Sequence, residues 1–198
     1  MKKYILLCLP VLLTLPGIGI AATCVPYNNV IYALQANGAN GTLTKTQTCS
    51  GDNNSGNYSI TSQINVSKGF FSKEINQTAT GTYASPNTIV AQNFTNSNNS
   101  ASLPTGNLDT LSLALYLSSS LSANITTFPA LPVFYNSNTI TVQCAIIPSA
   151  SSTAQISCPT ADNSQVLNYS FSPDSSYLML SANAVENGVT TMSAAINQ

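Results

Sequence analysis

The stretch TITVQCAIIPSASSTAQISC at residues 139–158 decides the fold class, because it predicts two β-strands that turn back on each other. Apolar residues alternate with polar ones in each half, which is typical of a strand with one buried face. If Cys144 faces Cys158, then Ile146 faces Ile156 in the same register. A slip of one residue would place the cysteines and the isoleucines on opposite faces. The sequence therefore predicts an antiparallel hairpin that is cross-linked by a disulfide.

The first 22 residues have the form of a signal peptide. Lysines follow Met1, residues 5–15 are apolar, and two alanines precede Thr23. We therefore expect residues 1–22 to be removed on export and residues 23–198 to form a single domain. The apolar run is shorter than the ~20 residues that a membrane-spanning helix needs, and no later stretch is apolar enough to span. The mature chain is predicted to be secreted, periplasmic or in the cell envelope of a bacterium, without a transmembrane segment.

Charge and composition exclude several classes of function. The chain has no arginine, and after removal of the predicted leader three lysines stand against six acids, a net charge of 3 − 6 = −3. Phosphate neutralisation cannot drive binding with so few cations, so nucleic acid is not expected as a partner. The chain also lacks histidine, so neither a Ser-His-Asp catalytic triad nor a histidine metal site can form.

The remaining catalytic and metal-binding patterns are weak. Each of the three lysines lies in a polar context that indicates exposure to solvent, so a serine-lysine hydrolase is not favoured. Asp162 and Asp174 lie in turn-forming clusters, which favours a structural role over a glycosidase pair. Residues 52–57 alternate oxygen ligands as a calcium loop does, but Asn57 stands where such a loop needs glycine. We expect no catalytic residue, no metal and no cofactor, and thus a protein that is not an enzyme.

Four cysteines follow the predicted leader, and an even number in an exported chain predicts two disulfides. Cys24 opposite Cys49 would place Val30 opposite Leu43, across a turn formed by NGANG at residues 37–41. The second pair is the one in the hairpin described above. A competing use of Cys24 is a lipid anchor. Thr23 counts against it, because the residue before a lipidated cysteine is normally smaller.

Single hydrophobic residues separated by Ser, Thr and Asn run through the rest of the chain. This pattern predicts about ten short strands in an all-β, antiparallel domain, either an up-and-down barrel of the lipocalin-like kind or a β-sandwich. Residues 93–107 carry almost no apolar side chain and are predicted to form a polar, mobile loop. Alternation and export also suit a transmembrane barrel, but the absence of tryptophan and of a terminal aromatic residue counts against it.

Residues 108–121 are the one ambiguous segment, because leucine and alanine favour helix while four leucines alternate strictly. A helix would place those leucines on two opposite arcs, whereas a strand would gather them on one face. We therefore expect a strand whose apolar face could contact a ligand. The leucines are Leu111, Leu113, Leu115 and Leu117.

Two non-catalytic functions remain open. The favoured hypothesis is an exported binding or surface-interaction protein, since a nearly uncharged exterior of Ser, Thr and Asn can bind a protein or a glycan. The alternative is a soluble barrel that carries a small apolar ligand, and a second alternative is an envelope protein anchored through Cys24. An apolar cavity of about 300 Å³ or more against the leucine face would favour the carrier.

Overall fold

The computed structural model describes residues 23–85, 87–97, 99–149, 152–174 and 176–197. The predicted signal peptide lies outside the described residues. Within them the chain forms thirteen strands and one helix. In chain order these are β1 (Tyr27–Ala36), β2 (Ala39–Gly51), β3 (Ser55–Lys68), β4 (Phe71–Ala84), β5 (Thr88–Asn96), β6 (Asn99–Ser102), β7 (Leu108–Asp109), α1 (Thr110–Ser122), β8 (Thr127–Tyr135), β9 (Asn138–Ile147), β10 (Ala154–Pro159), β11 (Gln165–Phe171), β12 (Met179–Glu186) and β13 (Val189–Ile196).

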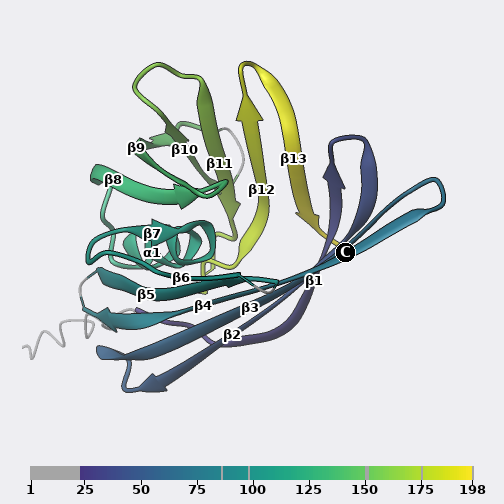
Figure 1. Cartoon of the computed structure of the whole chain (residues 1–198). Helices are drawn as coiled ribbons and strands as arrows, with labels where there is room; N and C mark the ends of the chain where they lie inside the picture. Colours follow the sequence, from purple (N-terminus) through teal and green to yellow (C-terminus); the bar gives the residue numbers. More distant parts are fainter. Residues whose placement is uncertain (1–22, 86, 98, 150–151, 175, 198) are drawn as a thin grey trace, which may run out of the picture.

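The strands form one sheet in the order β6-β5-β4-β3-β2-β1-β13-β12-β11-β10-β9-β8-β7. Neighbouring strands are antiparallel except β7 and β8, which pair in parallel over two residues. Because β1 pairs with β13, the N-terminal and C-terminal strands lie side by side. Figure 1 shows the sheet bent so that β1 to β6 lie on one side of α1 and β8 to β12 on the other. The prediction of an all-β, antiparallel, up-and-down domain is confirmed, as one barrel-like sheet rather than two stacked sheets.

The hairpin that opens the sequence analysis has the expected register. Ile146 pairs with Ile156, and the next pair on that face brings Cys144 and Cys158 to a Cα–Cα distance of 4.0 Å, with their sulfurs bonded. The predicted bond between Cys24 and Cys49 is also present, with a Cα–Cα distance of 6.1 Å. Two disulfides indicate an oxidising compartment. In this structure the sulfur of Cys24 is bonded to that of Cys49.

Losing the Cys144–Cys158 bond should destabilise the fold moderately. The bond closes a loop of 14 residues in sequence separation, and cross-linking a loop of that length restricts the unfolded chain. We expect the double replacement Cys144→Ala with Cys158→Ala to lower the free energy of unfolding by about 2 to 3 kcal/mol. Urea denaturation of the variant beside the oxidised protein measures this difference, and a loss below about 0.5 kcal/mol would contradict it.

The register of the first hairpin differs from the prediction by two residues. Val30 lies opposite Lys45 rather than Leu43. The reason is the turn: Asn37 and Gly38, with φ of 50° and 75°, make the complete connection between β1 and β2. Positive φ at both central residues is what a two-residue hairpin turn requires, so the first Asn-Gly pair alone makes the turn.

The predicted polar loop at residues 93–107 is also partly wrong. Its first residues end β5, and Asn99–Ser102 form β6, which pairs antiparallel with β5. Backbone pairing does not need apolar side chains, so a polar sequence can complete a sheet edge. Only residues 103–107 connect β6 to β7 without strand structure.

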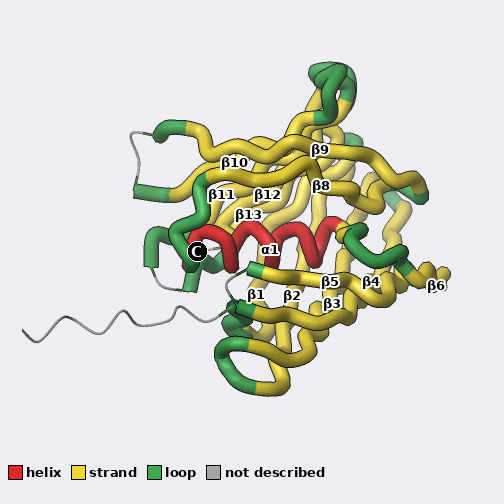
Figure 2. Tube along the Cα trace, turned by 90° about the vertical axis from the view of Figure 1, so that its left-hand side faces the viewer, coloured by secondary structure: helices red, strands yellow, loops and turns green. Residues whose placement is uncertain are grey.

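The strand predicted for residues 108–121 is the largest error. Leu108 and Asp109 form β7, and residues 110–122 form the helix α1. The alternating leucines do lie on two arcs, as expected for a helix, but both arcs are buried because the curved sheet encloses α1 (Figure 2). A helix that is buried on most sides needs no single apolar stripe. The exposed fractions are 7% for Leu111, 0% for Leu113, 4% for Leu115 and 0% for Leu117.

The start of α1 is set by Asp109. Its side-chain Oδ1 accepts hydrogen bonds from the backbone N–H groups of Leu111 at 2.8 Å and Ser112 at 3.0 Å. These are the bonds by which an N-cap aspartate satisfies the first free N–H groups of a helix. An aspartate just before an apolar run was therefore the helix signal in this sequence.

Candidate functional site

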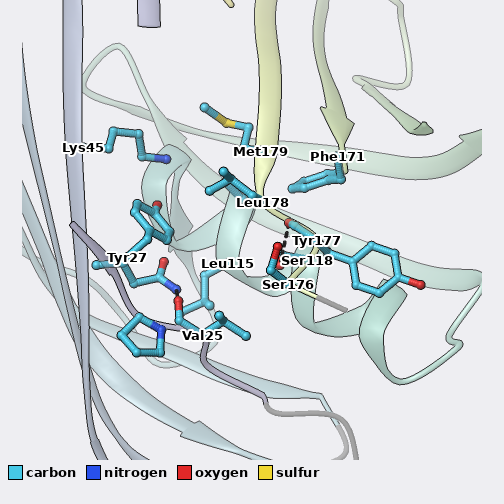
Figure 3. Close-up of a pocket in the computed structure, with 13 residues that line it drawn as sticks. Val25, Tyr27, Lys45, Leu115, Ser118, Phe171, Ser176, Tyr177, Leu178 and Met179 are labelled. Atoms are coloured by element: carbon cyan, nitrogen blue, oxygen red, sulfur yellow. Dashed lines mark hydrogen bonds between the residues drawn. The ribbon is translucent and has the colours of Figure 1, made fainter. Parts of the chain in front are cut away.

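A cavity of about 110 Å³ lies inside the curved sheet, beside α1 (Figure 3). Its walls come from the start of β1, the inner face of β2, one side of α1, and the chain around the start of β12. The lining is mainly apolar, with a lysine, a glutamine and two serines among it. The residues are Val25, Pro26, Tyr27, Lys45, Gln47, Ala114, Leu115, Ser118, Phe171, Ser176, Tyr177, Leu178 and Met179.

Lys45 reaches this cavity because of the alternation along β2. Leu43, Lys45 and Gln47 share one parity and are all buried, whereas the threonines between them are less so. Lys45 is 3% exposed, and Figure 3 shows its amine directed towards the other lining residues. The prediction that this lysine is solvated is wrong. Parity with Leu43 and Cys49 was the signal that could have revealed it.

Among the described residues, Asp109 is the charged group that acts on the ammonium of Lys45, and the two do not form an ion pair at contact distance. Ser62, directly opposite Lys45 on β3, has a buried hydroxyl without a hydrogen-bond partner. Burial lowers the pKa of Lys45 from its usual 10.5 to about 8, and the negative charge of Asp109 offsets part of that effect. A buried cation of this kind is costly unless something compensates its charge.

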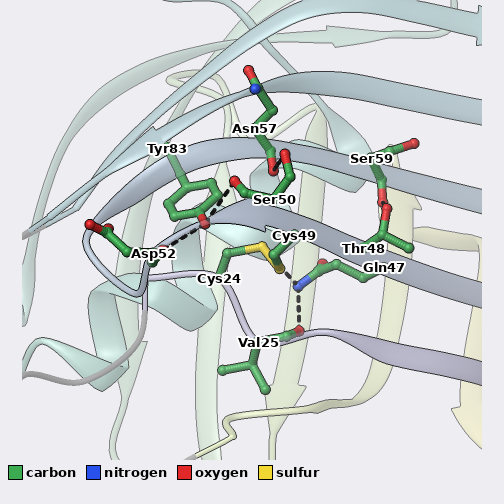
Figure 4. The surroundings of a disulfide bond; sticks show 10 residues. All are labelled: Cys24, Val25, Gln47, Thr48, Cys49, Ser50, Asp52, Asn57, Ser59 and Tyr83. Carbon is green, nitrogen blue, oxygen red and sulfur yellow. Dashed lines mark hydrogen bonds between the residues drawn. A yellow bond between two sulfur atoms is a disulfide. The ribbon is translucent and has the colours of Figure 1, made fainter.

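The wall beside Lys45 is held by the first disulfide and by Gln47. The amide of Gln47 donates a hydrogen bond to the carbonyl oxygen of Val25 at 2.8 Å, and the Cys24–Cys49 bond lies next to it (Figure 4). Together they fix the chain that enters β1 against the end of β2. The predicted disulfide thus shapes one side of the cavity.

The opposite wall is tied to the helix and to β1. Ser118 of α1 donates a hydrogen bond to the carbonyl oxygen of Tyr177 at 3.0 Å. The hydroxyl of Tyr32 donates to the carbonyl oxygen of Met179 at 2.9 Å. Because side chains of two other elements hold this backbone, the cavity has fixed walls on both sides.

A buried chain of hydrogen bonds lies at the N-terminal end of α1. The hydroxyl of Ser112 donates to Oδ2 of Asp109 at 2.6 Å, and Tyr58 lies 2.8 Å from the same serine oxygen. Since the one serine proton is used on Asp109, Tyr58 must be the donor in the second bond. Burial raises the pKa of Asp109, while the hydrogen bonds from Ser112 and Leu111 act to lower it. Burial thus favours the neutral form of Asp109, while its hydrogen bonds favour the carboxylate, in the interior that Lys45 shares.

The residues singled out from the sequence occupy different places. Leu115 lines the cavity, whereas Leu111, Leu113 and Leu117 are buried but are not among its lining residues. The leucine face is thus mostly filled core, and the cavity is well below the ~300 Å³ expected of a carrier. A second hollow of about 300 Å³ lies at the β1–β2 turn, but its lining is largely polar and includes none of the four leucines.

The acids considered from the sequence serve turns. Asp52 accepts hydrogen bonds from the backbone N–H groups of Asn54 and Ser55, both at 2.7 Å. Asp162 bonds to side chains of its own turn, and so does Asp174. Hydrogen bonds lower the pKa of all three carboxyl groups, with Ser55 foremost for Asp52. In none of these turns does the structure bring two acids together.

Comparison with known proteins gives a limited result. No family model matches the chain, and no curated protein matches it. Among solved structures, the chain is similar to a β-barrel-like protein of the domain of unknown function DUF1849 from Brucella abortus. That likeness has a TM-score of 0.49 at 10% sequence identity, over 88% of this chain and 97% of the other.

Proposed function

We propose that this protein is an exported, non-catalytic binding protein whose cavity takes a small anionic ligand with a short apolar part. The observation that supports the proposal is Lys45, a cation that is 3% exposed and whose charge is offset among the described residues by Asp109 alone, without an ion pair at contact distance. A bound carboxylate would supply a counter-charge at contact distance. The apolar side chains around it would receive the hydrocarbon part.

The volume of the cavity limits the size of the ligand. An engineered cavity of about 150 Å³ accommodates one benzene molecule, so 110 Å³ suits roughly four to six non-hydrogen atoms. A carboxylate with two to four carbons has four to six non-hydrogen atoms and fits this range, and a long-chain lipid does not. The proposal therefore keeps the small-ligand alternative but replaces a purely apolar ligand with an acid.

The same cavity supports binding rather than catalysis. An amine with a pKa near 8 can act as a nucleophile, but turnover also needs a group that moves protons. Among the described residues, the cavity lining contains no carboxylate and no histidine. Lys45 is thus proposed to attract and orient a ligand, and no reaction step is assigned to it.

Calorimetric titration with short carboxylates tests the proposal. We expect propionate and butyrate to bind at pH 7, and butyramide, which has the same shape as butyrate without the charge, to bind at least about tenfold more weakly. The variant Lys45→Met should lose carboxylate binding, while Lys73→Met, which removes a lysine of the β3–β4 hairpin, should keep it. Equal affinity for acid and amide, retained binding in Lys45→Met, or no binding of any short carboxylate would each contradict the proposal.

The affinity should also depend on pH in a defined direction. The charged form of Lys45 binds the anion, and its pKa without ligand is about 8. Below pH 8 the site is charged and the affinity should be constant, whereas above pH 8 each further unit should weaken binding about tenfold, until the raised pKa of the complex is reached. Titrations of butyrate from pH 6.5 to 9.5 measure this. A dissociation constant that stays the same across the range would contradict the role of the ammonium.

A further inference from the structure

The tip of the β3–β4 hairpin carries two adjacent aromatic side chains in solvent. Phe70 is fully exposed and Phe71 is 84% exposed. The next most exposed large apolar side chain is Val189, at 65%. The turn itself is short, since Lys68 pairs with Phe71 across Gly69 and Phe70. Nothing in the described fold covers these rings.

On one side the hairpin projects beyond β5. On the other side β2 pairs with β3 as far as Ser67, and the ammonium of Lys68 donates a hydrogen bond to the carbonyl oxygen of Asn37 at 3.3 Å. β4 pairs with β5 only from Gln77 onward, so residues 71–75 pair with β3 alone. Figure 1 shows this hairpin extending outward past the edge of the curved sheet. The two phenylalanines therefore lie at the end of an extension. They can insert into an apolar environment while the rest of the protein stays in water.

The tip carries two lysines, with one acid next to them. The described residues contain three lysines, of which Lys45 is buried, while Lys68 and Lys73 flank the phenylalanines. The nearest acid along the hairpin is Glu74, whose carboxylate accepts hydrogen bonds from the amides of Asn76 and Gln63. A chain with more acids than lysines thus places both remaining cations beside its most exposed aromatic rings.

We propose that this tip, residues 68–73, docks on an anionic lipid bilayer, with Phe70 and Phe71 in the boundary between headgroups and acyl chains and the two lysines against lipid phosphates. Exposed apolar side chains with flanking lysines suit that interface, where rings leave water and ammonium groups meet negative charge. A protein interface of ordinary stability buries about 800 Å² on each partner. A narrow hairpin end with two rings offers far less, which favours lipid over a protein partner.

Tryptophan fluorescence tests the docking directly, because the chain contains no tryptophan. Phe70→Trp introduces a single reporter at the tip, and Val189→Trp introduces one at the turn between β12 and β13. With vesicles of phosphatidylcholine containing a quarter phosphatidylglycerol, the emission of Phe70→Trp should shift to shorter wavelength and be quenched by brominated acyl chains. Val189→Trp should show neither change. An unshifted Phe70→Trp spectrum, or an equal response of both variants, would overturn the proposal.

Vesicle sedimentation measures the contributions of the aromatic rings and of the lysines separately. The unmodified protein and its variants are purified after export for this test. The double variant Phe70→Ser with Phe71→Ser should bind about tenfold more weakly or worse, and Lys68→Gln with Lys73→Gln should lose roughly tenfold and no longer respond to salt. Val189→Ser is the control, and circular dichroism should show that every variant is folded. Unchanged binding in the phenylalanine variant would overturn the proposal. So would self-association that requires the phenylalanines while no vesicle binding occurs, since that would make a second copy the partner.

Discussion

Replacing Lys45 with methionine should stabilise the protein by about 3 kcal/mol at pH 7 while it removes binding of the small acid. Methionine has a similar length and no charge, so it fills the same space without the cost of burying an ammonium group. The magnitude follows from the pKa, which burial lowers from 10.5 to about 8, since each pKa unit corresponds to about 1.4 kcal/mol. Urea denaturation at pH 7 measures the gain.

The pH dependence of stability gives the same prediction an independent check. Because the pKa of Lys45 is lower in the folded protein, the unfolded chain binds more protons between pH 8 and 10.5. The stability of the unmodified protein should therefore rise with pH from about pH 8, as the cost of the charge disappears. The buried tyrosines Tyr32, Tyr58 and Tyr169 act in the opposite direction from about pH 10, because burial raises their pKa values.

The useful window is thus from pH 8 to about 9.5, where Lys45→Met should lose the rise that the unmodified protein shows. Lys73→Met is the control, and it should follow the unmodified protein. If Lys45→Met were less stable than the unmodified protein at pH 7, the ammonium would have a stabilising partner and the account of the cavity would be wrong.

Replacing Asp109 with alanine should destabilise the protein by about 4 kcal/mol, the largest loss we expect from a single side chain. Alanine removes the cap on the N–H groups of Leu111 and Ser112 and the acceptor of the Ser112 hydroxyl. All of these groups are buried, because Asp109 and Ser112 are both 0% exposed. Loss of a cap costs about 1 to 2 kcal/mol, and each buried group left unpaired adds about 1 to 3 kcal/mol.

Asparagine at the same position is the matched control. Its oxygen can accept the two backbone hydrogen bonds, and its amide can donate to the hydroxyl of Ser112. One buried hydroxyl proton of the Ser112–Tyr58 pair then loses its acceptor, so we expect Asp109→Asn to cost about 1 to 2 kcal/mol, no more than half the loss in the alanine variant. Equal losses in the alanine and asparagine variants, measured by urea denaturation, would show that the capping bonds are not what holds the start of α1.

The Cys144–Cys158 bond could be predicted from the sequence because its evidence is local. Cys144 and Cys158 share a register with Ile146 and Ile156, and strand alternation alone fixes that relation. The turn at Asn37 and Gly38 was less well predicted. Two Asn-Gly pairs stand close together there, and sequence does not say which one closes the hairpin.

The helix α1 could not be predicted from periodicity, because its surroundings come from distant parts of the chain. Leu113 and Leu117 are buried among strands that are far from them in sequence, so both faces of the helix meet apolar partners. The aspartate cap was a local signal, and giving it more weight than the alternation of leucines would have produced the right answer.

The candidate site was missed for a different reason. Lysine is almost never fully buried, so Lys45 was assigned to solvent in spite of its inward parity on β2. The cavity also depends on elements that only the fold brings together, since Lys45 of β2 meets Leu115 of α1 and Met179 of β12 there. Only the parity of Lys45 was visible in the sequence.

The most direct test of the account is to titrate the amine of Lys45 by NMR, with the protein labelled at the lysine side chains. We predict a pKa of about 8 for Lys45 without ligand, and a pKa that rises when butyrate is added because the bound carboxylate favours the charged form. Lys68 and Lys73 provide internal references in the same spectra. A Lys45 pKa close to 10.5 that does not respond to butyrate would contradict both the burial of this cation and its role in binding.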